Sequence, residues 1–110
     1  MYYTYMLRCE DDSVYTGITT DPVRRFREHI SRSKRAAGYT RSHRAERVIA
    51  LWKSRDRSLA SKLEYSIKSL DKQQKELIAL SGSLNIFSGR LSTEDYTFVP
   101  VSEFFKDDMQ

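Results

Sequence analysis

Two short stretches rich in aromatic and β-branched residues, separated by an acidic run, constrain the fold of this chain most strongly. The first covers Tyr2 to Arg8 and the second Ser13 to Ile18, with residues 10–12, Glu-Asp-Asp, between them. Such residues favour strands and polar residues favour a turn, so the pattern predicts a β-hairpin with a loop of about three to five residues. Because side chains alternate between the faces of a strand, an even offset across the hairpin would place the phenols of Tyr5 and Tyr15 on one face.

The next segment predicts a helix that begins at Asp21-Pro22. Asp is a favoured N-cap, and Pro suits the first helical position because its missing N–H would have no partner there. Arg25 and His29 lie four residues apart on one face, and Arg25 falls in the first turn, where the helix N-terminus favours an anion such as phosphate. The buried stripe is expected at apolar positions with helical spacing: Val23, Phe26 and Ile30.

The remainder of the chain predicts one more strand and two more helices. Residues 31–45 are expected to form a basic helix tail that runs into a loop. The apolar run Val48 to Trp52 is interpreted as a third strand, although a helical turn fits the same run. Helically spaced apolar residues follow Asp56, and Gln73 to Leu80 predicts another helix that ends before a Ser-Gly pair. We expect this helix pair to pack on the sheet.

The composition changes at Ser83. Thr97 to Val101 reads as a short edge strand, because it contains Pro100. Residues 92–110 carry one lysine and five acidic residues. We therefore expect an α+β domain over residues 1–82 and a C-terminal extension over 83–110 that packs on or near its core.

Charge is distributed unevenly along the chain. Residues 22–62 hold thirteen Lys and Arg against three acidic residues, a net charge of +10, whereas the rest carries −6. A basic middle segment suits a surface that faces phosphates, because Lys and Arg displace the counterions condensed on nucleic acid. A solvated helix face or an anionic lipid would also account for it. With one cysteine, Cys9, no intramolecular disulfide or multi-cysteine zinc site is expected. No apolar stretch reaches the roughly 20 residues that span a bilayer, so we expect a cytoplasmic protein.

The order of these motifs resembles the GIY-YIG nuclease superfamily. Residues 3–5, Tyr-Thr-Tyr, are followed ten residues later by Tyr-Thr-Gly at 15–17, and then by Arg25 and His29. YTGITTDPVRRFREH (15–29) and ASKLEYSI (60–67) are similar to small stand-alone bacterial members of the uncharacterised, YhbQ-like kind. The resemblance covers about residues 2–80. It implies the GIY-YIG fold, a three-stranded antiparallel sheet flanked by helices, which agrees with the elements read above.

The resemblance also implies hydrolysis of phosphodiester bonds in DNA with one divalent cation, Mg²⁺ or Mn²⁺. Glu64 would be the sole carboxylate ligand of that ion. Arg25 would clamp the scissile phosphate with its planar guanidinium. Tyr5 is the candidate general base, and a nearby cation would have to lower the pKa of its phenol. The catalytic set carried over by motif position is Tyr5, Tyr15, Arg25, His29 and Glu64.

The same resemblance implies roles for Tyr15, Gly17 and His29. Tyr15 would hydrogen-bond the phosphate or the attacking water, and Gly17 would allow a close approach of the backbone. His29 would relay a proton or bond Tyr5, or else bridge to a neighbouring glutamate such as Glu28 or to the backbone. Basic side chains of the middle segment are expected to hold the phosphate backbone of DNA: Arg24, Arg32, Lys34, Arg35, Arg41 and Arg44.

Simpler interpretations stand beside these. Strand tyrosines usually pack in a core, and Glu64 has a lysine four residues later, Lys68, with which it would form an ion pair. The sequence departs from the family pattern at Tyr3, where a glycine is usual, and the late asparagine of many members has no clear match, because Asn85 is taken as structural. A DNA-binding module without hydrolysis is therefore the alternative. No sequence-reading motif is visible, so specificity would come from DNA structure, as in repair, or from a partner protein.

Overall fold

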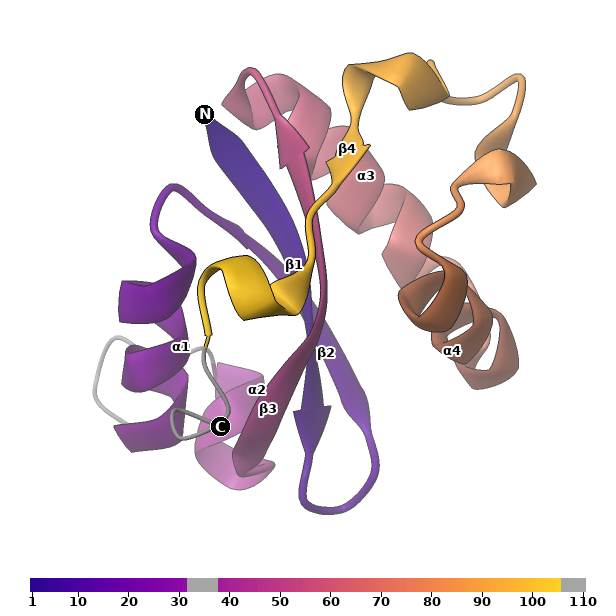
Figure 1. The fold of residues 1–110 in the computed structure, drawn as a ribbon. Helices are drawn as coiled ribbons and strands as arrows, with labels where there is room; N and C mark the ends of the chain where they lie inside the picture. Colours follow the sequence, from indigo (N-terminus) through magenta and orange to yellow (C-terminus); the bar gives the residue numbers. More distant parts are fainter. Residues whose placement is uncertain (32–37, 106–110) are drawn as a thin grey trace.

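The structure, a computed structural model, describes residues 1–31 and 38–105. Its centre is an antiparallel sheet with the strand order β2-β1-β3-β4 and helices on both faces (Figure 1). The predicted α+β class with an antiparallel sheet is confirmed. A fourth strand of two residues, contributed by the C-terminal extension, lies beside the third. The strand bounds are Tyr2–Cys9 for β1, Val14–Thr19 for β2, Ala45–Ser54 for β3 and Thr97–Phe98 for β4.

The hairpin of β1 and β2 forms as predicted. Residues 10–13 connect the two strands, and Tyr5 lies opposite Gly17 while Leu7 lies opposite Tyr15. The offset between the two tyrosines is therefore even, and both phenols lie on the same face of the sheet. Since β2 pairs with β1 alone, this face ends at the free edge of β2.

Helix α1, Pro22–Ser31, begins where predicted, because the Asp21 carboxylate accepts a hydrogen bond from the backbone N–H of Arg24 at 3.1 Å. The predicted buried stripe was wrong in part. Ile30 is 44% exposed, and the buried residues of the helix are Pro22, Phe26 and His29. The face that meets the sheet is rotated toward His29, because a histidine with hydrogen-bond partners for both nitrogens can be buried where hydropathy predicts a polar surface.

Two features of the middle segment differ from the prediction. The expected loop contains a short helix, α2, over Gly38–Ser42. Strand β3 starts at Ala45, earlier than expected, and its pairing with β1 excludes the alternative of a helical turn. Exposed charged residues at the start of β3 conceal its strand character from a search for apolar runs.

Helices α3, Arg57–Lys68, and α4, Lys72–Ser81, form the predicted helix pair. Asp56 caps α3, and Asp71 with Gln74 forms a capping box at the start of α4. Helix α4 ends at Gly82, whose φ of 74° is the left-handed conformation that favours glycine.

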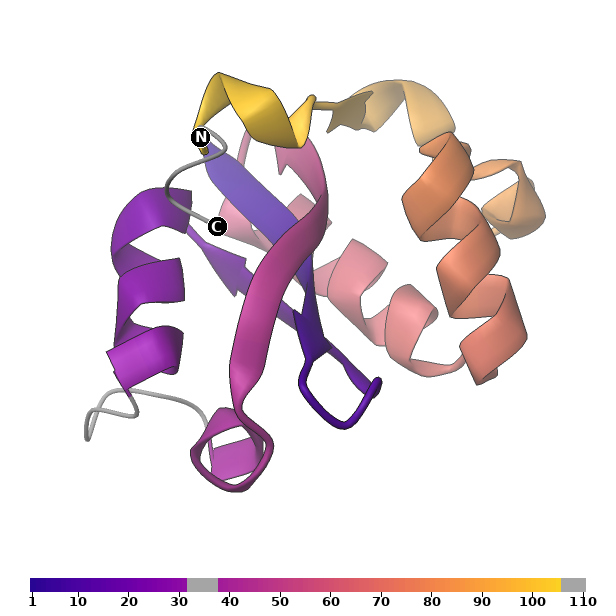
Figure 2. The same ribbon diagram turned by 60° about the horizontal axis from the view of Figure 1, so that its bottom comes forward.

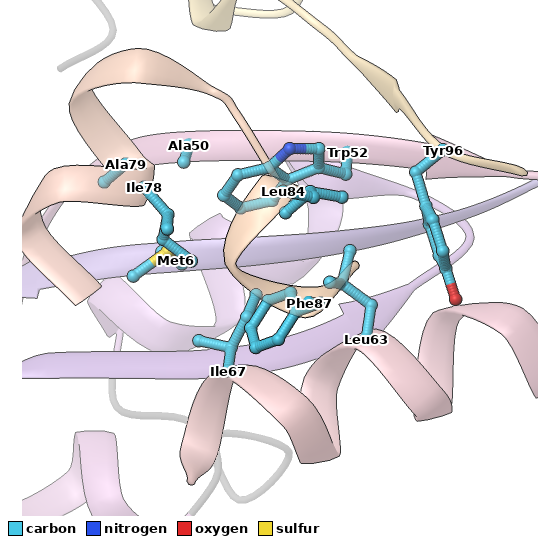
Figure 3. Packing of buried hydrophobic residues seen from close by; sticks show 10 residues of the cluster. All are labelled: Met6, Ala50, Trp52, Leu63, Ile67, Ile78, Ala79, Leu84, Phe87 and Tyr96. Atoms are coloured by element: carbon cyan, nitrogen blue, oxygen red, sulfur yellow. The ribbon is translucent and has the colours of Figure 1, made fainter. Parts of the chain in front are cut away.

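Two hydrophobic clusters lie on opposite faces of the sheet. The cluster on the face of α3 and α4 contains Trp52, Leu63 and Ile67, with Met6 reaching it from β1 (Figure 3). The other cluster lies under α1 and contains Tyr5, Leu7, Phe26 and Leu51. Alternation along β1 therefore sends Met6 to one core and Tyr5 to the other. As a result, Tyr5 belongs to the sheet face that α1 covers.

The C-terminal extension contributes to both clusters. After the 3-10 helices η1, Asn85–Phe87, and η2, Thr93–Asp95, it pairs with β3 as β4 and then forms η3, Val101–Glu103, on the α1 side (Figures 1 and 2). Phe87 is buried on one face, and Phe105 on the other. Phe104 makes an edge contact with Tyr3, with 5.3 Å between ring centroids. Tyr3, the residue at which the sequence departs from the pattern it resembles, thus packs against the extension.

Cys9 is a buried free thiol. Among the described residues, no helix has both the length and the apolar character required to cross a membrane.

Candidate active site

The hydroxyl of Tyr5 lies over the backbone of Gly17. A methyl group added at Gly17 would stand 2.5 Å from the Tyr5 hydroxyl oxygen and 2.7 Å from its ring carbon Cζ. No side chain fits at such distances unless the tyrosine moves. Glycine at this position of β2 therefore leaves the space that the Tyr5 phenol occupies.

His29 joins Tyr5 to a third side chain by two hydrogen bonds. Its Nε2 lies 2.8 Å from the Tyr5 hydroxyl, and its Nδ1 lies 2.6 Å from the hydroxyl of Thr40 on α2. His29 and Thr40 are both 0% exposed and Tyr5 is 3% exposed. Of the two interpretations of His29, contact with Tyr5 is the observed one. Glu28 pairs instead with Arg25, at 2.9 Å.

The donors and acceptors of this group define the tautomer of His29. The Arg25 guanidinium lies beside the Tyr5 phenol, and its positive charge favours a phenol oxygen that acts as an acceptor toward it. The Tyr5 proton is then directed at Nε2 of His29, which accepts it. A neutral imidazole carries one N–H, so Nδ1 is the protonated nitrogen and donates to the hydroxyl of Thr40.

Burial controls the protonation of the group. Burial, followed by the charge of Arg25, lowers the pKa of His29 to about 4, so the imidazole is neutral at neutral pH. The pKa of the Tyr5 phenol is raised well above its ordinary value, first by burial and then by Tyr15. Arg25 opposes that shift, as expected of a cation, but burial outweighs it. A lowered Tyr5 pKa was therefore the wrong expectation for the protein alone.

Tyr15 and Glu64 complete the arrangement at the edge of β2. The Tyr15 ring lies 6.3 Å from that of Tyr5 and 5.4 Å from that of His29, between centroids. Glu64 on α3 is close enough for its charge to raise the pKa of Tyr5. Its side chain is 24% exposed, and an oxygen lies 3.2 Å from the Lys68 ammonium. The ion pair considered as a simpler role for Glu64 is thus present, and Lys68 also lies 5.9 Å from the centre of the Tyr15 ring.

The structure therefore gathers Tyr5, Tyr15, Arg25, His29 and Glu64 from β1, β2, α1 and α3 around one edge of the sheet. The predicted phosphate-binding residues are more dispersed. Arg24 and Arg41 are exposed, and Arg44 lies 3.9 Å from Glu10. Three further residues of this set lie outside the described residues: Arg32, Lys34 and Arg35.

Thr40 is the site residue that sequence reasoning missed. A lone threonine in a segment rich in Ser and Arg carries no signal of burial, and a five-residue helix is too short for a periodic pattern. A search for a hydroxyl partner for the second nitrogen of His29 would have been the one route to it.

The order of these strands and helices, together with the side chains gathered at the edge of the sheet, can be compared with known protein families. A model of the GIY-YIG catalytic domain matches residues 1–77. The chain therefore belongs to the GIY-YIG family, as the motif order predicted.

Several relatives identify the subgroup as the YhbQ-like one. The UPF0213 protein BH0048 of Halalkalibacterium halodurans is 39% identical over 93 residues, which cover 84% of this chain and 97% of that protein. The UPF0213 protein FN1575 of Fusobacterium nucleatum is 44% identical over 77 residues, 70% of this chain and 75% of its own. The UPF0213 protein YhbQ of Salmonella typhimurium is 41% identical over 75 residues, 68% and 73% of the two chains. The solution NMR structure of BH0048 matches 84% of this chain and 99% of its own, with a TM-score of 0.46 at 39% identity.

Proposed function

We propose that this protein is a metal-dependent endonuclease that hydrolyses phosphodiester bonds in DNA and is directed by DNA structure, without reading sequence. One observation carries the proposal: in a GIY-YIG chain, the Tyr5 phenol is hydrogen-bonded to the His29 imidazole, and the Arg25 guanidinium, Tyr15 and Glu64 lie beside this pair. Such a group offers a proton acceptor and a phosphate clamp at one place.

The donor set suits magnesium. Among the described residues, no cluster of three or more His, Cys, Asp or Glu side chains is present, so a closed cage of protein ligands is excluded for that part of the chain. Mg²⁺ is commonly bound through one or two carboxylates, with waters and substrate phosphate completing its shell. Glu64, partly exposed beside Tyr5, is the residue that would hold it. Bound there, the ion would polarise the phosphoryl oxygen and stabilise the leaving oxygen.

The chain's own residues then supply the proton path. As the water oxygen bonds to phosphorus and the bond to the leaving oxygen breaks, the Tyr5 oxygen takes a proton from the water. The Tyr5 proton passes to Nε2 of His29 at the same time, along the 2.8 Å hydrogen bond. A free phenolate is therefore never required, which suits a phenol whose pKa is raised.

Arg25 connects the phosphate to this proton path. Its charge is one cause of the lowered pKa of His29, after burial. A phosphate bound to the guanidinium would offset that charge and make His29 a better proton acceptor. Arg25 would thus bind the substrate phosphate and, by doing so, make His29 more able to accept the proton.

Cleavage assays test the proposal. Supercoiled plasmid, single-stranded, flap and junction DNA are incubated with Mg²⁺ or with EDTA. We expect cleavage with Mg²⁺ alone, and a rate lowered at least about 100-fold by Glu64→Gln and by Arg25→Ala, because each removes charge stabilisation of the transition state.

Glu103→Gln, at an exposed glutamate of η3, is the matched control and should cleave like the wild type. Equal nicking by the wild type and Glu64→Gln would identify a contaminating nuclease and reject the proposal.

The alternative, a module that binds DNA without cleaving it, has one observation in its favour. Lys68 holds the Glu64 carboxylate at 3.2 Å, where a metal ion would have to displace it. Salt-dependent DNA binding with no cleavage under Mg²⁺ or Mn²⁺ would select this alternative.

A further inference from the structure

A groove runs between the solvent face of α3 and the turn formed by residues 88–91 of the C-terminal extension. Two cations, Lys62 and Arg90, line it together with Tyr65. Two serine hydroxyls, of Ser58 and Ser61, complete the polar lining, and the hydroxyl of Ser66 at its base donates to the Lys62 carbonyl at 2.9 Å. None of the described residues that line it is acidic. Its chemistry is that of a surface for an extended anion, with charge and hydrogen-bond donors along its length.

Both cations of the groove are available to a partner. Within the described part of the chain, neither Lys62 nor Arg90 takes part in an ion pair, in contrast to Arg8, which forms a two-point ion pair with Glu76. Positive charge without an acidic neighbour attracts phosphate more strongly than charge that is already neutralised.

The turn holds Arg90 in place. Gly89 adopts a φ of 86°, which favours glycine, and the backbone N–H groups of Arg90 and Leu91 donate to the Phe87 carbonyl at 2.9 and 3.0 Å. The Arg90 guanidinium lies 5.9 Å from the centre of the Phe87 ring, and Phe87 is fully buried. The cation is thus anchored on the core, which reduces the entropy lost when it binds a ligand.

Tyr65 adds an aromatic surface to the groove. Its side chain is 74% exposed, although a tyrosine in a helix usually buries its ring. An exposed ring between cations is the arrangement on which the bases of single-stranded nucleic acid stack, and such stacking tolerates any base.

The groove begins next to the proposed metal ligand. Ser61, at the rim of the groove, lies three residues before Glu64 on α3, so the two side chains are neighbours on the surface of the helix. A strand that passes Glu64 can therefore continue directly into the groove.

We infer that this groove holds a single strand of nucleic acid that leaves the active site, with its phosphates on Lys62 and Arg90 and a base against Tyr65. The inference rests on the proposed function, since the strand is the substrate of that site. It assigns the enzyme a preference for DNA with a single-stranded segment beside the cut. Arg90 lies outside residues 1–77, so the C-terminal extension contributes to substrate binding.

Binding in EDTA tests the inference without any cleavage. Fluorescence anisotropy measures the affinity for a labelled single strand of about 20 nucleotides, longer than the usual site of about 4–16. The variant Lys62→Ala/Arg90→Ala should bind about tenfold more weakly at about 0.15 M salt. The slope of log affinity against log salt should fall by about 1.4, because each lost phosphate contact removes roughly 0.7 for a single strand. Tyr65→Ala should weaken binding at least about fivefold, and Tyr65→Phe should not.

The matched control is Lys53→Ala/Lys75→Ala, which removes the same charge from β3 and α4, outside the groove, at two lysines that likewise form no ion pair with the described residues. An equal loss in the control would mean a general charge effect and overturn the inference. Equally strong competition by a polyglutamate peptide of matched charge would assign the groove to acidic proteins and overturn it too. The binding assay contains no metal and measures no cleavage. A failure of the nuclease proposal in the cleavage assay would therefore be distinguishable from a failure of this inference.

Discussion

At the scale of single residues, the proposed site depends on His29, whose two ring nitrogens are both hydrogen-bonded to hydroxyl groups. Thr40 is fully buried and contacts His29, so its role is to position that imidazole. By accepting from Nδ1–H at 2.6 Å, it leaves Nε2 free to accept the proton of Tyr5. A threonine on a five-residue helix thus decides which nitrogen faces the reaction.

Thr40→Val tests this role, because valine keeps the shape and removes the hydroxyl. Nδ1–H would lose its acceptor, the other tautomer would become populated, and we expect the cleavage rate to fall roughly 10–100-fold with little change in KM. NMR of the ring nitrogens should show Nδ1–H in the wild type and in Thr40→Ser, but not in Thr40→Val. An unchanged tautomer in Thr40→Val would reject the positioning role.

The sequence predicts the residues proposed to react better than it predicts the residues that position them. Tyr5 and Arg25 belong to motifs with a fixed order, and alternation along the hairpin was enough to place the two phenols on one face. Thr40 has no such pattern, because its burial is decided by a hydrogen bond across 11 residues of chain. The direction of the Tyr5 pKa was missed for a related reason. Burial depends on how α1 packs, which the order of motifs does not contain.

At the scale of elements, α1 is braced from outside by the extension. Phe105, which follows η3, is 2% exposed and makes an edge contact with Phe26 of α1, with 5.3 Å between ring centroids. Since α1 carries Arg25 and His29, the packing of η3 helps to set where the site residues lie. The same segment covers Tyr3, which explains how a tyrosine is accommodated at the glycine position of the first motif.

Phe105→Ala should therefore lower both stability and activity. Removing a buried phenylalanine ring costs about 3–5 kcal/mol of the free energy of unfolding, measured by urea denaturation. Ile86→Ala, in the same extension but at a residue 46% exposed, is the control, and its cost should stay below about 1 kcal/mol. Equal costs for the two variants would show that the extension does not brace α1.

The ends of helices could be predicted from the sequence wherever a capping residue marks them. Asp21 and Asp56 mark helix starts with side-chain caps, and Gly82 marks the end of α4. The buried face of α1 and the start of β3 were missed because tertiary packing decides them. In α1, His29 is buried because it has hydrogen-bond partners. At the start of β3, charged residues occupy the exposed positions of the strand.

At the scale of the whole molecule, the buried histidine links folding to pH. The pKa of His29 is about 4 in the folded protein, against 6.5 for the free side chain. Between these values the unfolded chain binds a proton that the folded protein does not, so stability falls as pH decreases through this window. The pKa of Glu76 is lowered by its hydrogen bonds to Arg8, so its contribution is lost only at lower pH.

We therefore expect the free energy of unfolding to decrease by up to roughly 3 kcal/mol between about pH 6.5 and pH 4. Urea denaturation at several pH values measures it. His29→Gln should remove most of the slope above about pH 5, whereas His43→Gln, at a partly exposed histidine, should keep it. The same slope in wild type and His29→Gln would rule out His29 as its source.

The path of the C-terminal extension also has a consequence for how the protein is made. Phe105 completes the hydrophobic cluster beneath α1, although α1 ends at Ser31. During synthesis the helix that carries Arg25 and His29 must therefore wait for more than seventy further residues before its packing is complete. A nascent chain stalled before this point would leave the part of Phe26 that contacts Phe105 open to solvent and to chaperones. The last part of the described chain to be translated thus determines when the proposed site becomes rigid.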